Sequence, residues 1–159
     1  MSQVVLGIDP GLKCTGYAVI QHNGKKPVLR EAGILTTRES NSLEQRLRSI
    51  HQSVDEVISE FHPDSMVVEK LYSHYAHPQT AVIMGHARGV IFLCAAMHDI
   101  PVVSYASTRI KKSITGNGHA SKNQVQRSIQ SIMMLEKMPE PPDVADAIAA
   151  ALCHIGAKR

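Results

Sequence analysis

The sequence predicts an α/β fold in which helices flank a five-stranded mixed sheet whose first three strands are antiparallel. Three observations support this prediction. The first 36 residues contain three β-branched stretches, residues 42–61 have the apolar spacing of an amphipathic helix, and two later apolar stretches each follow a helix. Short turns join antiparallel strands, whereas a strand entered from a helix usually joins its sheet through a crossover. The order of elements therefore predicts a mixed sheet.

Three strands are expected at the start of the chain. Residues 3–8 form an apolar run that ends at Asp9-Pro10-Gly11, and residues 15–21 form a second run that ends at His22-Asn23-Gly24. Turn-forming residues after such runs predict a hairpin. Residues 28–36 are expected to add a third strand.

A helix and a buried strand are expected next. Apolar residues recur at steps of three and four between Leu43 and Phe61, Asn41 or Ser42 can cap this helix, and Pro63 ends it. Residues 65–68 are apolar throughout, which is typical of a central strand that is buried on both faces. Glu69 is therefore expected at the end of a strand.

The second half of the chain is predicted to be mainly helical. The expected elements are a helix at 78–97, a strand at 102–105, a helical turn around Ile110, a loop at 116–118, a helix from Ser121 to about Met134 and a final helix from Asp143 to Ile155. The helix at 78–97 is apolar nearly all round at residues 90–94. This pattern predicts burial against the core on one side and against a partner subunit on the other.

Length and composition narrow the class of protein. The 159 residues predict a single domain, 1–159, and the net charge of +3 with a pI of about 8.8 permits a polyanionic partner. Cys14, Cys94 and Cys153 include no close pair, which argues against a disulfide framework. No basic segment precedes the N-terminal apolar stretch, and the longest apolar run, 89–97, is too short to span a bilayer. We therefore expect a cytoplasmic protein without a membrane segment.

Four carboxylates at the ends of elements form a candidate active site. Asp9 follows the first strand and Glu69 follows the fourth, so neighbouring parallel strands would place both at one edge of the sheet. Asp143 and Asp146 are three residues apart, which on a helix places their Cβ atoms on one face at about 5 to 6 Å. The small apolar residues around this pair would let the helix lie close to the sheet. Carboxylates gathered in this way repel one another and require cations.

Oxygen ligands favour Mg²⁺, or Mn²⁺ in its place, over zinc. Two such ions about 3.5 to 4 Å apart can activate a water molecule and stabilise the leaving oxygen when a phosphodiester is hydrolysed. Each carboxylate taken alone has an ordinary explanation, because Asp143 could be a helix cap, Asp9 a turn residue and Glu69 a solvated strand end. Their combination and order favour metal-dependent strand cleavage.

Several short motifs carry a resemblance to a known family. They are Gly7-Ile8-Asp9-Pro10-Gly11 with Thr15-Gly16-Tyr17, Val68-Glu69-Lys70, Gly85-His86-Ala87-Arg88-Gly89-Val90, Lys111 and Lys122 on either side of Gly116-Asn117-Gly118, and Asp143-Val144-Ala145-Asp146-Ala147. In this order and approximate spacing, the set resembles the RuvC family of bacterial Holliday-junction resolvases over nearly the whole chain.

The resemblance implies a ribonuclease-H-like fold and a homodimeric, Mg²⁺-dependent nuclease. Such an enzyme nicks two strands of like polarity symmetrically at a four-way DNA junction and leaves 5′-phosphate and 3′-hydroxyl ends. The resemblance also implies partnership with the RuvA and RuvB branch-migration proteins.

The resemblance assigns roles to individual residues as well. The catalytic, metal-binding carboxylates of the family correspond to Asp9, Glu69, Asp143 and Asp146, and its two DNA-contacting lysines correspond to Lys111 and Lys122. The family usually has Phe as the aromatic residue after the catalytic glutamate, whereas this chain has Tyr72. That difference could alter base contacts at the crossover without abolishing cleavage.

A basic segment is the candidate DNA surface. Residues 100–135 include no acidic residue. The basic side chains of this segment are Arg109, Lys111, Lys112, Lys122 and Arg127. Phosphates are the natural partner of such a segment, although a solvated basic face would have the same composition. His119 is a further candidate phosphate contact, Tyr72 could stack on an unpaired base, and the loop at 116–118 would let the segment move until DNA orders it.

Three alternative functions stay open at this point. The opening Gly7-Ile8-Asp9-Pro10-Gly11 also resembles the first phosphate loop of the actin and sugar-kinase superfamily, but those kinases need two such domains and this chain has room for one. The short YqgF-like nucleases share the opening but not the spacing of Lys111, Lys122 and the Asp143–Asp146 pair. A DNA-binding module without catalysis is the third alternative.

Overall fold

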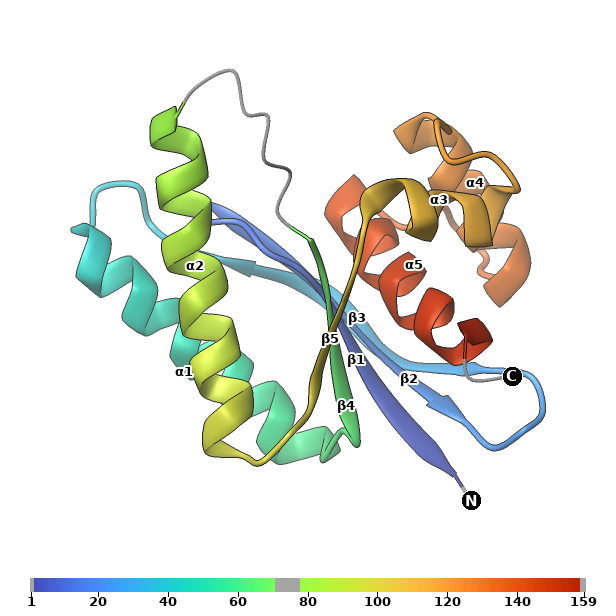
Figure 1. Ribbon diagram of the computed structural model, residues 1–159, viewed down its shortest axis with the longest axis horizontal. Helices are drawn as coiled ribbons and strands as arrows, with labels where there is room; N and C mark the ends of the chain where they lie inside the picture. Colours follow the sequence, from blue (N-terminus) through green and yellow to red (C-terminus); the bar gives the residue numbers. More distant parts are fainter. Residues whose placement is uncertain (1, 71–77, 158–159) are drawn as a thin grey trace.

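The computed structural model describes residues 2–70 and 78–157. The described residues form β1 (Gln3–Asp9), β2 (Cys14–His22), β3 (Val28–Thr36), α1 (Leu43–Phe61), β4 (Ser65–Glu69), α2 (Pro78–Met97), β5 (Val102–Tyr105), α3 (Ser107–Thr115), α4 (Lys122–Met133) and α5 (Pro142–Ala157). The strands form one sheet in the order β3-β2-β1-β4-β5 (Figure 1). The pairs among β1, β2 and β3 are antiparallel, and β4 is parallel to both β1 and β5. The predicted mixed sheet is therefore confirmed.

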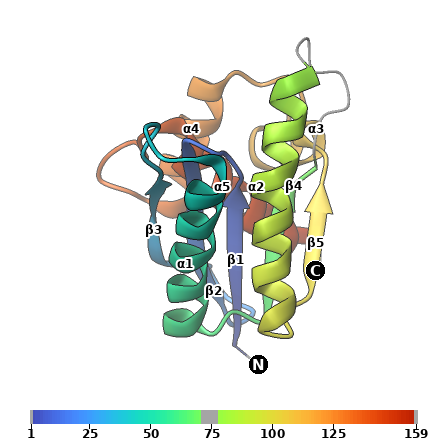
Figure 2. The same cartoon turned by 90° about the vertical axis from the view of Figure 1, so that its left-hand side faces the viewer.

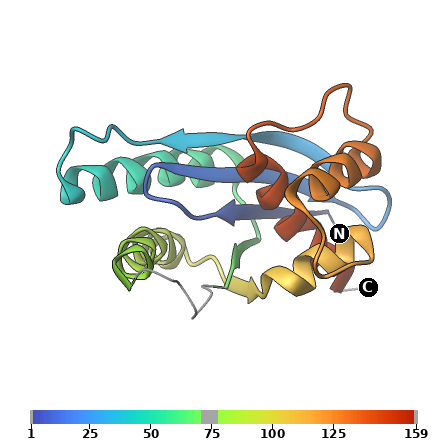
Figure 3. The same cartoon turned by 90° about the horizontal axis from the view of Figure 1, so that it is seen from above.

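Helices cover both faces of this sheet. Helices α1 and α2 pack beside each other on one face (Figure 2), and α3, α4 and α5 cover the other face (Figure 3). Successive side chains of a strand point to opposite faces. Leu6 and Ile8 accordingly join the apolar cluster under α1 and α2, whereas Val5 joins the cluster under α5. The sheet is thus buried on both sides, as its uninterrupted apolar strands predict.

The observed ends of the helices agree with the predicted ends in most cases. Helix α1 begins after Ser42, whose backbone N–H donates to Gln45 Oε1 at 3.1 Å, and it ends at His62, which is in the left-handed region. The helical turn expected around Ile110 is a longer helix, α3. Helix α5 begins at Pro142, so Asp143 lies in its first turn and is not the cap.

Helix α2 is apolar over most of its 20 residues, and not only over the run at 89–97. By length and composition α2 could cross a membrane, because an 18-residue window has a mean hydropathy of 1.6, and 22% of that window is buried. In the folded chain Ala87 and Ile91 pack into the core, and the Arg88 guanidinium donates to Ser104 Oγ of β5 at 2.8 Å. One side of α2 is therefore fixed to the sheet, while the apolar side chains of Val82, Leu93 and Met97 are exposed. The expected burial of the second side against a partner subunit stays a prediction.

Two glycines let α5 lie directly against the strands. A Cβ atom at Gly16 of β2 would overlap the carbonyl oxygen of Asp143, and a Cβ atom at Gly7 of β1 would overlap the carbonyl oxygen of Ala147. Five of the eleven buried residues of α5 are alanines, and the Cβ atom of Ala151 lies beside Gly7. Close approach thus depends on small residues from both elements.

We expect Gly16→Ala to lower the free energy of unfolding by about 1–3 kcal/mol, because the added methyl meets backbone that cannot move without shifting α5. Urea unfolding followed by circular dichroism measures this effect. Gly156→Ala is the matched control on α5, since a Cβ there has nothing within 4 Å. Equal stabilities of the two variants would contradict the close packing of α5.

Candidate active site

Asp9 and Glu69 lie side by side at the C-terminal ends of two parallel strands. Ile8 of β1 is level with Val68 of β4 in the register, so the next residue of each strand is a carboxylate. Ile8 and Val68 face α1 and α2, and alternation therefore turns Asp9 and Glu69 toward α5. This is the strand-end placement expected from the sequence.

Helix α5 brings the other two carboxylates to the same place. Asp143 lies over Gly16, and Gly16 is paired with Asp9 across β1 and β2. Asp146 is on the same side of α5 and lines a cavity of about 200 Å³ together with Asp9 and Glu69. All four carboxylates are half-buried. Segments from three parts of the chain thus meet at one acidic cavity.

Basic side chains from α3 and α4 lie against the carboxylates. Lys111 of α3 and Lys122, the first residue of α4, line the same cavity as Asp9, Glu69 and Asp146. Ser107 is also in the lining, and its hydroxyl interacts with Glu69. The cavity therefore presents negative groups on the sheet and α5 side and positive groups on the α3 and α4 side.

Asp9, Glu69 and Asp146 hold protons more tightly than free carboxylates do. Burial, followed by the charges of Asp146, Glu69 and Asp143, raises the pKa of Asp9 to about 8. Burial also raises the pKa of Glu69 and of Asp146, although Lys111 and Lys122 act in the opposite direction on both groups. Lys111 and Lys122 thus compensate only part of the negative charge of the carboxylates. A bound cation would supply the remaining compensation.

The raised pKa of Asp9 predicts how the free energy of unfolding depends on pH. The folded-state pKa of Asp9, about 8, is above its ordinary value, so the stabilising contribution of its proton is present at acidic pH and is lost as pH rises through about 8. In EDTA we expect the free energy of unfolding to fall by a few kcal/mol between about pH 5 and about pH 9, since each pKa unit corresponds to about 1.4 kcal/mol.

Urea unfolding at a series of pH values measures this dependence. Asp9→Asn should remove most of it, whereas Asp99→Asn, which changes an exposed carboxylate outside the cavity, should leave it unchanged. A pH-independent stability of the wild-type chain in EDTA would show that the carboxylates do not repel one another as inferred.

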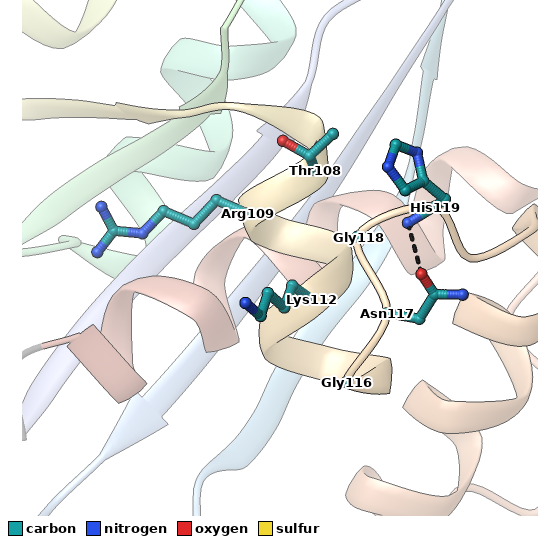
Figure 4. A pocket seen from close by; sticks show the side chains of 7 residues that line it. All are labelled: Thr108, Arg109, Lys112, Gly116, Asn117, Gly118 and His119. Atoms are coloured by element: carbon teal, nitrogen blue, oxygen red, sulfur yellow. Dashed lines mark hydrogen bonds between the residues drawn. The ribbon is translucent and has the colours of Figure 1, made fainter.

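The remaining predicted DNA contacts divide between two places. Arg109, Lys112 and His119 line a second cavity of about 580 Å³ beside the loop at 116–118 (Figure 4). Arg127 is exposed on α4 and lines neither this cavity nor the acidic one. Tyr72 lies outside the described residues.

The loop at 116–118 has defined local structure. Gly116 ends α3 in the left-handed region at φ 77°, and Asn117 Oδ1 accepts a hydrogen bond from the His119 backbone N–H at 3.0 Å (Figure 4). Gly118 also packs near Thr108 of α3. The expected movement of this loop before DNA binds stays a prediction.

Arg88 belongs to a motif that carries the family resemblance, but the sequence predicted no role for it at this site. Its guanidinium donates to the backbone carbonyl of Glu69 as well as to Ser104 Oγ, and it lies 4.5 Å from the centre of the Phe92 ring. Arg88 thereby connects α2 to the strand end that carries Glu69. The feature of the sequence that could have indicated this role is a single arginine within a mainly apolar helix.

Cys14 is a second residue with no predicted role at this site. Its Sγ lies 3.8 Å from Asp143 Oδ2, at the start of β2 beside the acidic cavity. The carboxylates of Asp143 and Asp9 raise the pKa of this thiol, after the larger effect of burial. The sequence offers no signal for this contact, because it joins residues that are 129 positions apart.

A mixed sheet in this strand order, with an acidic cavity at the ends of its parallel strands, defines a ribonuclease-H-like α/β protein with a carboxylate site. Residues 5–154 match the family model described as crossover junction endodeoxyribonuclease RuvC. The chain belongs to the RuvC family.

Individual relatives agree with this assignment. A crossover junction endodeoxyribonuclease RuvC from Rhodopirellula baltica is 52% identical over 149 residues, which cover 94% of this chain and 84% of that protein. The structure of Thermus thermophilus RuvC in complex with Holliday junction substrate superposes with a TM-score of 0.92 at 32% identity, over 99% of this chain and 95% of that chain. The yeast mitochondrial Holliday junction resolvase Ydc2, at 14% identity and a TM-score of 0.68 over 95% of this chain and 78% of that chain, shares the fold.

Proposed function

We propose that this chain is a structure-selective endonuclease that resolves four-way DNA junctions in recombination and repair. It makes paired symmetric nicks and leaves 5′-phosphate and 3′-hydroxyl ends. The observation that carries the proposal is the cavity lined by Asp9, Glu69 and Asp146 together with Lys111 and Lys122, because such a lining could hold a cation next to a phosphate group. The T. thermophilus relative has been solved with a Holliday junction substrate, which supports the same substrate here.

Asp9, Glu69, Asp143 and Asp146 would hold Mg²⁺, with Mn²⁺ able to replace it. The donor set suits a hard divalent cation, since it consists of carboxylate oxygens. Burial, and then the neighbouring carboxylates, raise the pKa of Asp9, Glu69 and Asp146. Four carboxylates offer enough oxygen ligands to share between two ions. Bound ions would supply an activated water and stabilise the leaving oxygen.

The basic residues would position the DNA around this centre. Lys111 and Lys122 are placed to bind the phosphate next to the scissile bond, because they share the cavity of the carboxylates. Arg109, Lys112 and His119 line the neighbouring cavity and would bind the backbone further along the strand. Arg127 is the most peripheral contact of this set, and Tyr72 would stack on an unpaired base at the crossover.

Paired nicks require two active sites, which a homodimer would provide. The exposed apolar side chains on α2, at Val82, Ile83, Leu93 and Met97, form the surface best suited to a second copy of the chain. Sedimentation velocity at micromolar concentration should give a dimer, and a species that stays monomeric would exclude this arrangement. RuvA and RuvB are the further expected partners, acting with this chain in the bacterial cytoplasm and not at a membrane.

One assay tests the function against its alternatives. A synthetic four-way junction, a linear duplex of the same sequence and ATP are each incubated with the protein, with and without Mg²⁺. Symmetric nicks on the junction alone, and only with Mg²⁺, are the expected result. Junction binding without cleavage would indicate an inert binding module, and ATP turnover would indicate the kinase class.

A further inference from the structure

A second group of metal-binding side chains lies on the face of the sheet opposite the acidic cavity. Asp55 of α1, Cys94 of α2 and His98, just beyond the end of α2, have ligand atoms that all lie within 4.8 Å of one another. Cys94 and His98 are four residues apart, so the end of the helix presents both on one side. Asp55 reaches them from the neighbouring helix, where its Oδ1 is 2.6 Å from His98 Nε2.

The three ligand atoms are close enough to share one ion. Three atoms that are mutually within 4.8 Å all lie within about 2.8 Å of a common point. Zinc binds sulfur at about 2.3 Å and nitrogen or oxygen at about 2.0–2.2 Å. Binding therefore requires inward shifts of about half an ångström, and the hydrogen bond between Asp55 and His98 must open. Both side chains have room for this movement, since His98 is 31% exposed and Asp55 is 44% exposed.

The types of ligand separate this group from the acidic cavity. Cys94 is buried below the exposed pair, with its thiol 3.9 Å from the carbonyl oxygen of His51. A thiolate, an imidazole and a carboxylate together select zinc-class ions, whereas Mg²⁺ prefers oxygen ligands alone. The Asp55 carboxylate and the His98 imidazole are thus accessible to solvent, whereas the Cys94 sulfur is buried beneath them.

We propose that Asp55, Cys94 and His98 bind one transition-metal ion of the zinc class. On binding, the Cys94 thiol loses its proton to solvent, and the contact between Asp55 and His98 is replaced by one bond from each residue to the ion. The fourth position of a tetrahedral site is left for water. The ion joins the end of α2 to α1, and the site does not depend on the nuclease activity proposed above.

Titration of the full chain with Co²⁺ tests this site, because Zn²⁺ gives no absorption signal of its own. We expect a sulfur-to-cobalt charge-transfer band and intense visible bands that saturate at one equivalent and disappear when Zn²⁺ is added. Absence of a thiolate band in the wild-type chain would overturn the proposal, and Asp55 and His98 would then be a surface ion pair above a buried thiol.

Variants identify the ligands. Cys94→Ala should abolish the band, while Cys14→Ser should retain it. Cys14 is the necessary control because its sulfur lies beside Asp143 at the other cavity. A band that survives Cys94→Ala but is lost in Cys14→Ser would assign the cobalt to the acidic cavity and reject the proposed site.

Two variants avoid the buried position, because Cys94→Ala could disturb the fold. His98→Gln and Asp55→Asn change exposed or half-exposed side chains, and each should weaken Co²⁺ binding at least about tenfold. Their circular dichroism without metal should match that of the wild type. His86→Gln changes an exposed histidine elsewhere on α2 and should have no effect. Unchanged Co²⁺ affinity in both His98→Gln and Asp55→Asn would also overturn the proposal.

Discussion

Asp9→Asn should lower the rate of junction cleavage about a thousandfold or more while leaving junction binding nearly unchanged. Asp9 interacts with all three other carboxylates, and its pKa is raised to about 8. The amide cannot bind a divalent cation as a carboxylate does, so several kcal/mol of charge stabilisation in the transition state are lost, at about 1.4 kcal/mol for each factor of ten.

Single-turnover cleavage with excess protein and Mg²⁺ measures the chemical step. Fluorescence anisotropy with a labelled junction in EDTA measures binding separately. Asp99→Asn makes the same chemical change at an exposed position and should cleave at the wild-type rate. If Asp9→Asn retained cleavage within a factor of ten of the wild type, Asp9 would not be a metal ligand.

The same substitution should stabilise the metal-free protein, and this opposite effect separates lost chemistry from a damaged fold. With a pKa of about 8, Asp9 must take up a proton when the metal-free chain folds near neutral pH, or else carry a charge that its neighbours repel. Asparagine avoids both costs. A variant that is inactive because it has unfolded would instead be less stable than the wild type in EDTA.

Local pattern was enough to predict the sheet and the position of its carboxylates. The apolar strands and the turns after them fix β1 and β2, and the parallel placement of β4 beside β1 brings Asp9 and Glu69 level. Asp143 and Asp146, three residues apart on α5, then join Asp9 and Glu69 once α5 packs closely against the sheet. The alanines of α5 indicate that closeness, but the part played by Gly7 and Gly16 is visible only once strand and helix are packed together.

Contacts made through tertiary packing could not be predicted. In the sequence Arg88 is one charge in a mainly apolar helix, and only the packing of α2 on the sheet brings its guanidinium to Glu69 of β4 and Ser104 of β5. The basic segment reads as one surface, yet the helical turn of α3 directs Lys111 to the acidic cavity and Lys112 to its neighbour. The spacing of Cys94 and His98 is local, whereas Asp55 joins them from another helix, at a sequence distance that no short motif covers.

Replacing both Lys111 and Lys122 with Ala is expected to weaken junction binding and to slow cleavage about a hundredfold. Each phosphate contact that is lost leaves its counterions on the DNA, so the slope of log K against log salt should become shallower by about 0.9 for each lysine. The matched control is Lys25→Ala with Lys26→Ala, which removes the same charge from exposed positions in the turn between β2 and β3. An unchanged salt slope in the Lys111 and Lys122 variant would place the DNA surface elsewhere.

The double variant should also need less Mg²⁺ to reach half of its own maximal cleavage rate. Lys111 and Lys122 lower the pKa of both Glu69 and Asp146, and the same positive charges repel a divalent cation, so removing them should strengthen Mg²⁺ binding. The Lys25 and Lys26 control keeps these neighbours and should keep the wild-type Mg²⁺ requirement. A lower Mg²⁺ requirement combined with a shallower salt slope would mean that the same two lysines act on the phosphate and on the carboxylates, as expected for lysines that share one cavity with the carboxylates.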